Sequence, residues 1–192
     1  MGHNVHYVWT RLPYLFVLLA IAILGTILHE TGHGATAIIL GGEIHSVAIM
    51  PGIQLYPTVE FQLWNGWIAQ IAYSALDSSW QQGLATIMGS GLTAFAGCGA
   101  IAVLLATRPK GLARFAWLSA AILFTWDGLA YSIFPTLGLK HWIVVGGSVA
   151  EPAIGATEMG ITSSIYYAGL VLYAAASQGL ILACLVQERS KG

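Results

Sequence analysis

The chain has 192 residues, of which 57% are hydrophobic and only 8% are charged, whereas an ordinary soluble domain has about 25% charged residues. This composition argues against a soluble protein and indicates one that lies in a membrane. The net charge is −1, and the seven Lys and Arg residues form no cluster that could follow a phosphate backbone. The sequence therefore predicts no nucleic-acid partner.

Four apolar stretches reach the length of about 20 residues that crosses a bilayer as a helix. We expect spans at about residues 12–40, 83–106, 115–134 and 163–186. Pro13 fits the first turn of the first span. The second span is rich in small residues, which allow close contact between helices. Cys98 and Cys184 lie inside spans and are interpreted as packing residues.

The connection between the first two spans has two parts with different patterns. Residues 44–50 and 53–62 are β-prone runs separated by Pro51 and Gly52, which predicts a β-hairpin. Residues 64–77 have apolar side chains at helical spacing, which predicts a helix. Residues 140–161 are apolar but interrupted by Gly and Pro, and are not expected to span. The predicted fold is a single all-α polytopic membrane domain, residues 1–192, with about four transmembrane helices and a small extramembrane β-hairpin after the first.

The direction of the chain across the membrane follows from its basic residues, because Lys and Arg accumulate in short cytoplasmic segments. Six of the seven lie on one side of the predicted topology, and Lys140 is the exception. The six are Arg11, Arg108, Lys110, Arg114, Arg189 and Lys191. We therefore expect a multi-pass protein of a cell membrane with both termini in the cytoplasm.

One motif carries chemistry: residues 29–33 have the form His-Glu-x-x-His inside the first span. Four-residue spacing on a helix puts His29 and His33 on one face, where both imidazoles can bind one zinc ion. Glu30 lies beside them, where a carboxylate can take a proton from an attacking water and return it to the leaving amine. Ionisable residues in a bilayer are costly, on the order of 3 kcal/mol each. The three residues together therefore indicate a metal site with a catalytic base.

A catalytic zinc ion usually has three protein ligands, so a third ligand must come from another segment. Asp127 is the only acidic residue inside another predicted span. At about 1.5 Å per residue it lies roughly 20 Å from the cytoplasmic end of its helix, and His29 lies roughly 27 Å along its own. The two depths agree within about a helical turn and ordinary tilt. If the first and third spans are neighbours, Asp127 can therefore meet the two histidines, and we expect His29, His33 and Asp127 to be the metal ligands.

The other His and acidic residues are not expected to bind the metal. His45 and His141 fall near predicted span boundaries and are interpreted as polar interfacial residues. His3 and His6, in the amino-terminal tail, receive no role. Four carboxylates outside the spans are expected to be solvated loop residues: Glu43, Glu60, Glu151 and Glu158.

The His-Glu-x-Gly-His motif in the first span, the Gly-rich second span and the Asp127-Gly128 pair in the third together resemble the site-2 protease family of intramembrane zinc metalloproteases. The resemblance implies zinc ligands at His29, His33 and Asp127, and a catalytic base at Glu30. It also implies one Zn²⁺ per chain and hydrolysis of peptide bonds in membrane-anchored proteins. The chain is most similar to compact, divergent bacterial or archaeal members.

The expected function is that of a zinc metalloendopeptidase whose partners are a membrane protein or peptide substrate and the lipid bilayer. A substrate helix must be locally unwound before cleavage, because its backbone is internally hydrogen-bonded. The hairpin at residues 44–62 is expected to hold the substrate extended by edge-strand pairing. Two alternatives remain open: a non-proteolytic zinc-binding membrane scaffold or sensor, and an ion transporter. Substrate identity and oligomeric state do not follow from the sequence.

Overall fold

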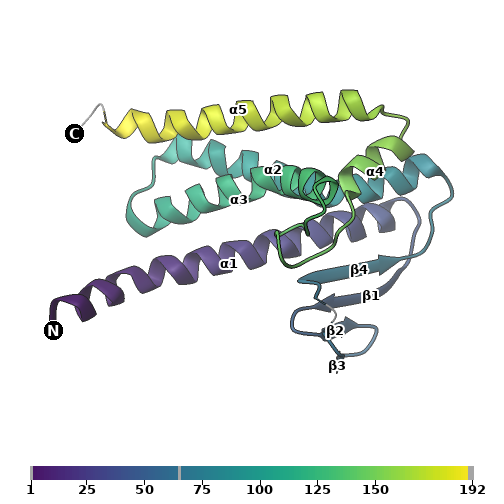
Figure 1. Ribbon diagram of the computed structural model, residues 1–192, viewed down its shortest axis with the longest axis horizontal. Helices are drawn as coiled ribbons and strands as arrows, with labels where there is room; N and C mark the ends of the chain where they lie inside the picture. Colours follow the sequence, from purple (N-terminus) through teal and green to yellow (C-terminus); the bar gives the residue numbers. More distant parts are fainter. Residues whose placement is uncertain (1, 65, 190–192) are drawn as a thin grey trace.

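The computed structural model describes residues 2–64 and 66–189, with side chains described for 11–64 and 66–186. It is a bundle of four long helices with a small sheet packed beside one end (Figure 1). The helices are α1 (Gly2–Ile39), α2 (Ser79–Thr107), α3 (Gly111–Thr136), the short α4 (Glu151–Glu158) and α5 (Ser163–Arg189). The strands are β1 (Ile44–Ile49), β2 (Ile53–Tyr56), β3 (Glu60–Phe61) and β4 (Ala69–Tyr73).

The four long helices match the four predicted spans. Each contains a stretch that is long and apolar enough to cross a membrane: Arg11–Ile39, Ser79–Thr107, Gly111–Thr136 and Ser163–Val186. Large apolar side chains on α1 and α5, such as Phe16 and Leu172, are exposed on the outside of the bundle, as a lipid-facing surface requires. The predicted fold class of four transmembrane helices with a small β-structure after the first is confirmed.

Two helix ends differ from the prediction. α1 begins at Gly2, so Pro13 lies inside the helix and not in its first turn. α2 begins at Ser79 and not at Gly83, because the Ser78 hydroxyl accepts a hydrogen bond from the Gln81 backbone N–H at 3.3 Å. Such a cap satisfies one of the free N–H groups at a helix start. The helices therefore extend beyond the apolar stretches by which they are recognised.

The strands form one antiparallel sheet in the order β3-β2-β1-β4. The predicted hairpin is β1 and β2, which turn at Pro51 and Gly52. Gly52 has φ +100, and a side chain there would also collide with the Gln62 carbonyl, so the turn requires glycine. The strand order leaves β4 at the edge that packs against α1.

The predicted helix over residues 64–77 is wrong, because this segment contains β4. Ile71 of β4 lies opposite Val47 of β1 in the antiparallel ladder. Gln70 is exposed between the half-buried Ala69 and Ile71, an alternation typical of a strand. The apolar spacing suited a helix equally well, but β1 offers hydrogen-bond partners to the backbone of this segment. Pairing with β1 therefore overrides the local pattern.

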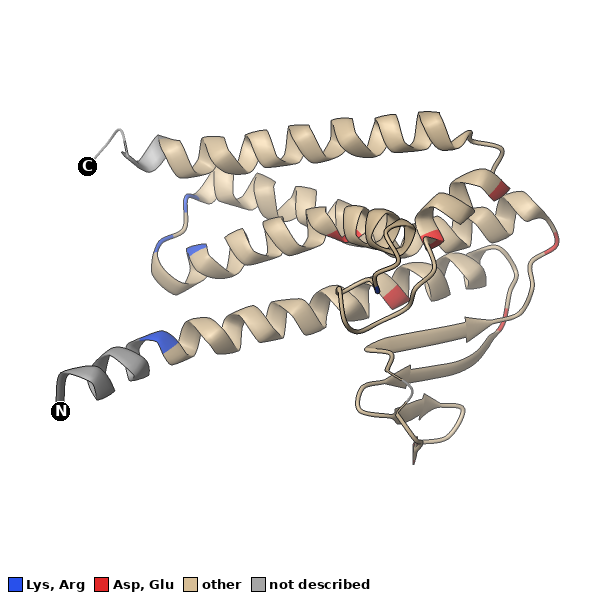
Figure 2. Ribbon diagram, viewed as in Figure 1, with Lys and Arg blue, Asp and Glu red and all other residues tan. Residues whose placement is uncertain are grey.

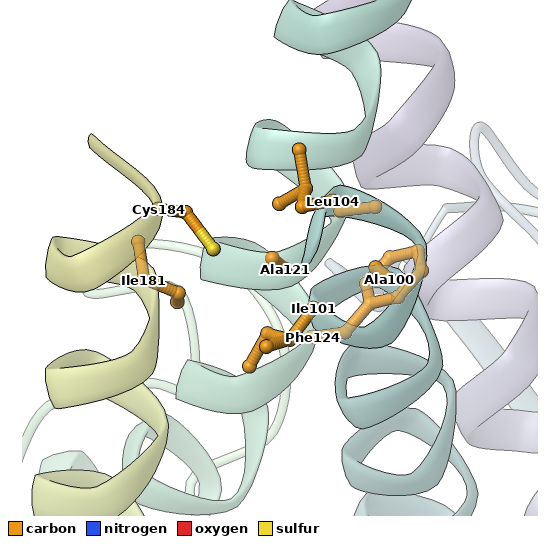
Figure 3. Close-up of a cluster of buried hydrophobic side chains, with 8 residues drawn as sticks. Ala100, Ile101, Leu104, Ala121, Phe124, Ile181 and Cys184 are labelled. Atoms are coloured by element: carbon orange, nitrogen blue, oxygen red, sulfur yellow. The ribbon is translucent and has the colours of Figure 1, made fainter. Parts of the chain in front are cut away.

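An apolar cluster joins α2, α3 and α5 in one half of the bundle (Figure 3). Its buried members are Ala100, Ile101, Leu104, Ala120, Ala121, Phe124, Ile181 and Cys184. Cys184 is thus a packing residue, as expected, whereas Cys98 is exposed on α2. This cluster holds α3 centrally, with α1 on its other flank.

The other half of the bundle is joined through glycines. A Cβ on Gly32 of α1 would collide with the Met88 carbonyl of α2, so the two backbones lie in direct contact there. Gly83 of α2 and Gly155 of α4 likewise face each other, and a Cβ on either would collide with the carbonyl of the other. Such small-residue contacts let helices approach closely in a membrane. They place the carboxyl-terminal part of α1 and the middle of α4 against the first turns of α2.

Candidate metal centre

His29 and His33 lie on one face of α1, as their spacing predicts. Both side chains are buried, with exposures of 1% and 8%. Their Nε2 atoms are 3.0 Å apart, and the rings meet edge to face. The two imidazoles thus present the same atom to one small volume between α1 and α2.

The second nitrogen of each ring is held by an acceptor. The His33 Nδ1–H donates to the Ala85 carbonyl at 2.8 Å, and the His29 Nδ1–H donates to Asp127 Oδ2 at 2.9 Å. A carbonyl only accepts, so a neutral His33 carries its proton on Nδ1 and a lone pair on Nε2. The carboxylate fixes the same tautomer in His29. When both rings are neutral, as metal binding requires, each Nε2 carries a lone pair, and the two Nε2 atoms are 3.0 Å apart.

Glu151, the first residue of α4, supplies a third acceptor at the same place. Its Oε2 lies 3.6 Å from His29 Nε2 and 3.7 Å from His33 Nε2. Ligands bound tetrahedrally at about 2.0–2.1 Å from zinc are about 3.3 Å from one another, and the three observed separations lie close to this value. His29, His33 and Glu151 form a group that could hold a metal ion, with all three ligand atoms within 4.8 Å of one another.

The surroundings of the three atoms also fit a cation. When both rings are neutral, the two Nε2 atoms and the Glu151 oxygen are all acceptors, and a cation among them removes their mutual repulsion. Gly89 of α2 borders the pair of imidazoles, and a Cβ there would collide with Nε2 of both rings. Glycine at this position therefore preserves the space that an ion bound to His29 and His33 would need.

Asp127 meets His29, as the comparison of depths predicted, but on the opposite side of the ring. Its Oδ2 accepts from His29 Nδ1 at 2.9 Å and from the Thr93 hydroxyl at 2.8 Å. Asp127 is not one of the three residues whose ligand atoms converge. A carboxylate in this place orients a ligand imidazole and raises its basicity. Ligation by Asp127 stays a prediction, and the geometry favours Glu151 as the third ligand.

Glu151 was expected to be a solvated loop residue, and this is wrong. Its side chain is 24% exposed and faces the two imidazoles from the start of α4. Its Oε2 lies 3.6 Å from His29 Nε2 and 3.7 Å from His33 Nε2, beyond hydrogen-bond distance, so this oxygen keeps lone pairs that a cation could use. The signal in the sequence was an acidic residue within an apolar stretch.

The other residues that were expected to be interfacial or solvated divide into two groups. His45, Glu43 and Glu60 are exposed on or near the sheet, as expected. His141 is buried at 1% exposure, so its interpretation as an interfacial residue is wrong, and Glu158 is half-buried rather than solvated. His3 and His6 lie outside the described side chains. Sequence reasoning also missed Gly89 and Thr93, which carry no charge to mark them.

Glu30 borders a cavity of about 250 Å³ beside the three converging atoms. His33, Glu151, Gln70 and Tyr73 also line this cavity. A second, apolar groove of about 440 Å³ runs between α1 and the sheet and reaches Glu30 from the other side. The Glu30 carboxylate thus lies at the boundary between a polar cavity and an apolar groove.

Comparison with protein families, with curated proteins and with solved structures finds no match to this chain. The fold and the site define a membrane protein with four apolar helices and a buried His-His-Glu group able to hold a metal ion. Any more specific assignment depends on the chemistry of these residues.

Proposed function

We propose that the chain is an intramembrane zinc metalloprotease that hydrolyses peptide bonds of membrane-anchored proteins, similar to the site-2 protease family. The observation that carries the proposal is the convergence of three acceptor atoms, His29 Nε2, His33 Nε2 and Glu151 Oε2, beside the carboxylate of Glu30. Two nitrogens and one oxygen are a ligand set that zinc accepts in hydrolases, where it keeps one position open.

The three ligands would hold one Zn²⁺ per chain. A zinc ion held there supplies Lewis-acid polarisation of a peptide carbonyl and acidifies a water molecule. Asp127 and Thr93 keep the His29 ring in the tautomer that directs Nε2 toward the ion. Ala85 does the same for His33 through its backbone carbonyl. The helices thus fix both rings before any ion binds, which lowers the cost of binding.

Glu30 acts as the general base in this proposal. It follows His29 in α1 and lines the polar cavity together with His33 and Glu151. A carboxylate there can accept a proton from the attacking water and donate it to the leaving amine. The cavity, about 250 Å³ in volume, has room for several water molecules and carries the polar partners that they need. It supplies the water that hydrolysis within a bilayer requires.

The apolar groove suits the substrate. Its walls are aliphatic side chains of α1, β1 and β4, among them Ile38, Val47 and Ile71. An extended peptide leaving the lipid would place aliphatic side chains in this groove and its backbone near Glu30. The edge strand β4 lines both the groove and the polar cavity, so strand pairing would occur at β4 and not at the hairpin that the sequence pointed to.

The proposed orientation in the membrane follows the charges. Figure 2 shows basic positions in α1 just after its grey first turns and around the connection of α2 with α3, whereas the half that carries α4 and the sheet has acidic positions and one basic position, between α3 and α4. Lys and Arg accumulate on the cytoplasmic side, which puts both termini in the cytoplasm and the sheet on the other side. A bacterial or archaeal cell membrane is the proposed location.

The decisive experiment compares Glu30→Gln with wild type in purified protein. Zinc content is measured by elemental analysis, and activity by cleavage of a membrane-anchored reporter in liposomes. We expect Glu30→Gln to bind zinc fully and to cleave nothing. Glu43→Gln makes the same change at an exposed carboxylate and should behave as wild type.

Three other outcomes would reject the proposal. Unchanged cleavage by Glu30→Gln would remove the general base. Zinc binding by a wild-type protein that cleaves none of the membrane peptides would support the zinc-binding scaffold or sensor. Metal flux into the liposomes without cleavage would support the transporter.

A further inference from the structure

The segment between α3 and α4, residues 137–150, folds around the side chain of His141. We call this segment the α3–α4 strap. The backbone N–H of His141 donates to the Gly147 carbonyl at 2.9 Å, and its ring Nε2–H donates to the Val149 carbonyl at 2.6 Å. The side chain is 1% exposed. His141 thus closes the strap on itself by two hydrogen bonds, one from its backbone and one from its ring.

The carbonyl that His141 binds is connected directly to Glu151. The Val149 oxygen also accepts the backbone N–H of Glu151 at 2.9 Å. The N-cap residue of α4, Ala150, makes no side-chain cap. One carbonyl oxygen therefore links the His141 ring to the backbone of the residue whose carboxylate faces His29 and His33.

Aromatic packing fixes the ring of His141 relative to the metal centre. The Tyr131 ring lies between two imidazoles, with its centroid 4.0 Å from that of His29 and 3.8 Å from that of His141. The strap is tight on the other side, because a Cβ on Gly147 would lie 2.9 Å from the His141 ring and 2.8 Å from that of Trp67. The column His29, Tyr131 and His141 therefore sets the distance between α1 and the strap.

We propose that His141 is a positioning residue for the metal centre: it holds the strap so that the Glu151 carboxylate stands opposite His29 and His33. The proposal rests on the proposed metal site but not on proteolysis. His141 is not one of the three residues whose ligand atoms converge, and its Nε2–H donates to the Val149 carbonyl. Without the ring, the Val149 carbonyl loses one hydrogen-bond donor. The strap also loses its stacking contact with Tyr131 of α3. The Glu151 carboxylate would then have to be ordered when the ion binds, which weakens binding.

Two substitutions separate the hydrogen bond from the volume of the ring. His141→Gln keeps an N–H that can donate to Val149, whereas His141→Leu fills similar space without a donor. Zinc affinity of the purified chain is measured by competition with a chelator, and the geometry of the site by the visible spectrum of the Co²⁺-substituted protein. We expect His141→Leu to weaken zinc binding by about 10–100-fold and to alter the cobalt spectrum. His141→Gln should retain most of the affinity, and His45→Leu, at an exposed histidine, should match wild type.

A double-mutant cycle tests whether His141 acts through Glu151 or through general stability. If it acts through Glu151, His141→Leu will cause no further loss of affinity in a Glu151→Ala background. Independent losses that multiply would overturn the proposal, because distant or purely structural effects add as free energies. Wild-type affinity and an unchanged cobalt spectrum in His141→Leu would also overturn it. Wild type that binds zinc tightly but cleaves nothing would refute the protease alone and leave the role of His141 intact.

Discussion

Two carboxylates flank the His29 ring in different surroundings. Asp127 lies in the interior between α2 and α3, is 7% exposed, and accepts two hydrogen bonds shorter than 3 Å, from His29 and Thr93. Glu151 begins a short helix outside the spans, is 24% exposed, and its Oε2 lies 3.6 Å or more from either imidazole. The Asp127 oxygen that faces His29 already accepts two hydrogen bonds and orients the ring, whereas the Glu151 oxygen accepts no hydrogen bond from either imidazole and can bind a cation. The difference between the two predicts how their variants will behave.

The largest effect should come from Glu151→Ala, which removes a ligand. We expect zinc affinity, measured by chelator competition, to fall by more than about 100-fold. Glu43→Ala is the matched control at an exposed carboxylate and should leave affinity unchanged. Near-normal affinity in Glu151→Ala would return the role of third ligand to Asp127.

Gly89→Ala should have the next largest effect, because a methyl group there would occupy the space beside both Nε2 atoms. Overpacking costs about 1–3 kcal/mol, which corresponds to a loss of zinc affinity of up to about 100-fold. Gly99→Ala lies on the same helix with nothing within 4 Å of the added carbon, and should bind zinc as wild type does. Equal zinc affinity in Gly89→Ala and Gly99→Ala would mean that the ion does not bind beside Gly89.

Asp127→Asn should weaken zinc binding by about 10–100-fold, the range for partners that orient a ligand imidazole. The variant should still reach one Zn²⁺ per chain at saturating metal, measured by elemental analysis. Failure to bind at any concentration, with Glu151→Ala nearly normal, would reverse the assignment of the two carboxylates.

The smallest effect is expected for Thr93→Val, which removes one of the two donors to Asp127 but keeps the shape of the side chain. The same competition assay should show a loss of less than about tenfold, because the bond from His29 remains. A loss larger than that of Asp127→Asn would mean that Thr93 contacts the ion's surroundings directly.

The sequence was sufficient for the parts of the molecule governed by a helix in a bilayer. The lengths of the apolar stretches predicted the four spans, the spacing of His29 and His33 predicted their common face, and matched depth brought Asp127 to His29. The span lengths, the common face of His29 and His33 and the two depths depend on the rise and period of a single helix, so the local sequence pattern contains them. The contact of Asp127 with His29 also requires α1 and α3 to be neighbours, which the pattern does not contain.

The sequence failed where one segment folds onto another. The position of Glu151 depends on the strap and on the contact between Gly83 and Gly155, which join residues far apart in the chain. The strand β4 depends on its partner β1, although its own apolar spacing suited a helix. Neither the position of Glu151 nor the pairing of β4 with β1 produces a periodic pattern in the sequence, so neither could be predicted from it.

The placement of the three converging residues has a consequence for biosynthesis. His29 and His33 enter the membrane with the first segment, whereas Glu151 follows α3. A ribosome must therefore deliver three of the four hydrophobic helices before the full set of ligands can assemble. If the centre is hydrolytic, the nascent chain stays inactive during most of its insertion and becomes active late, when α4 docks.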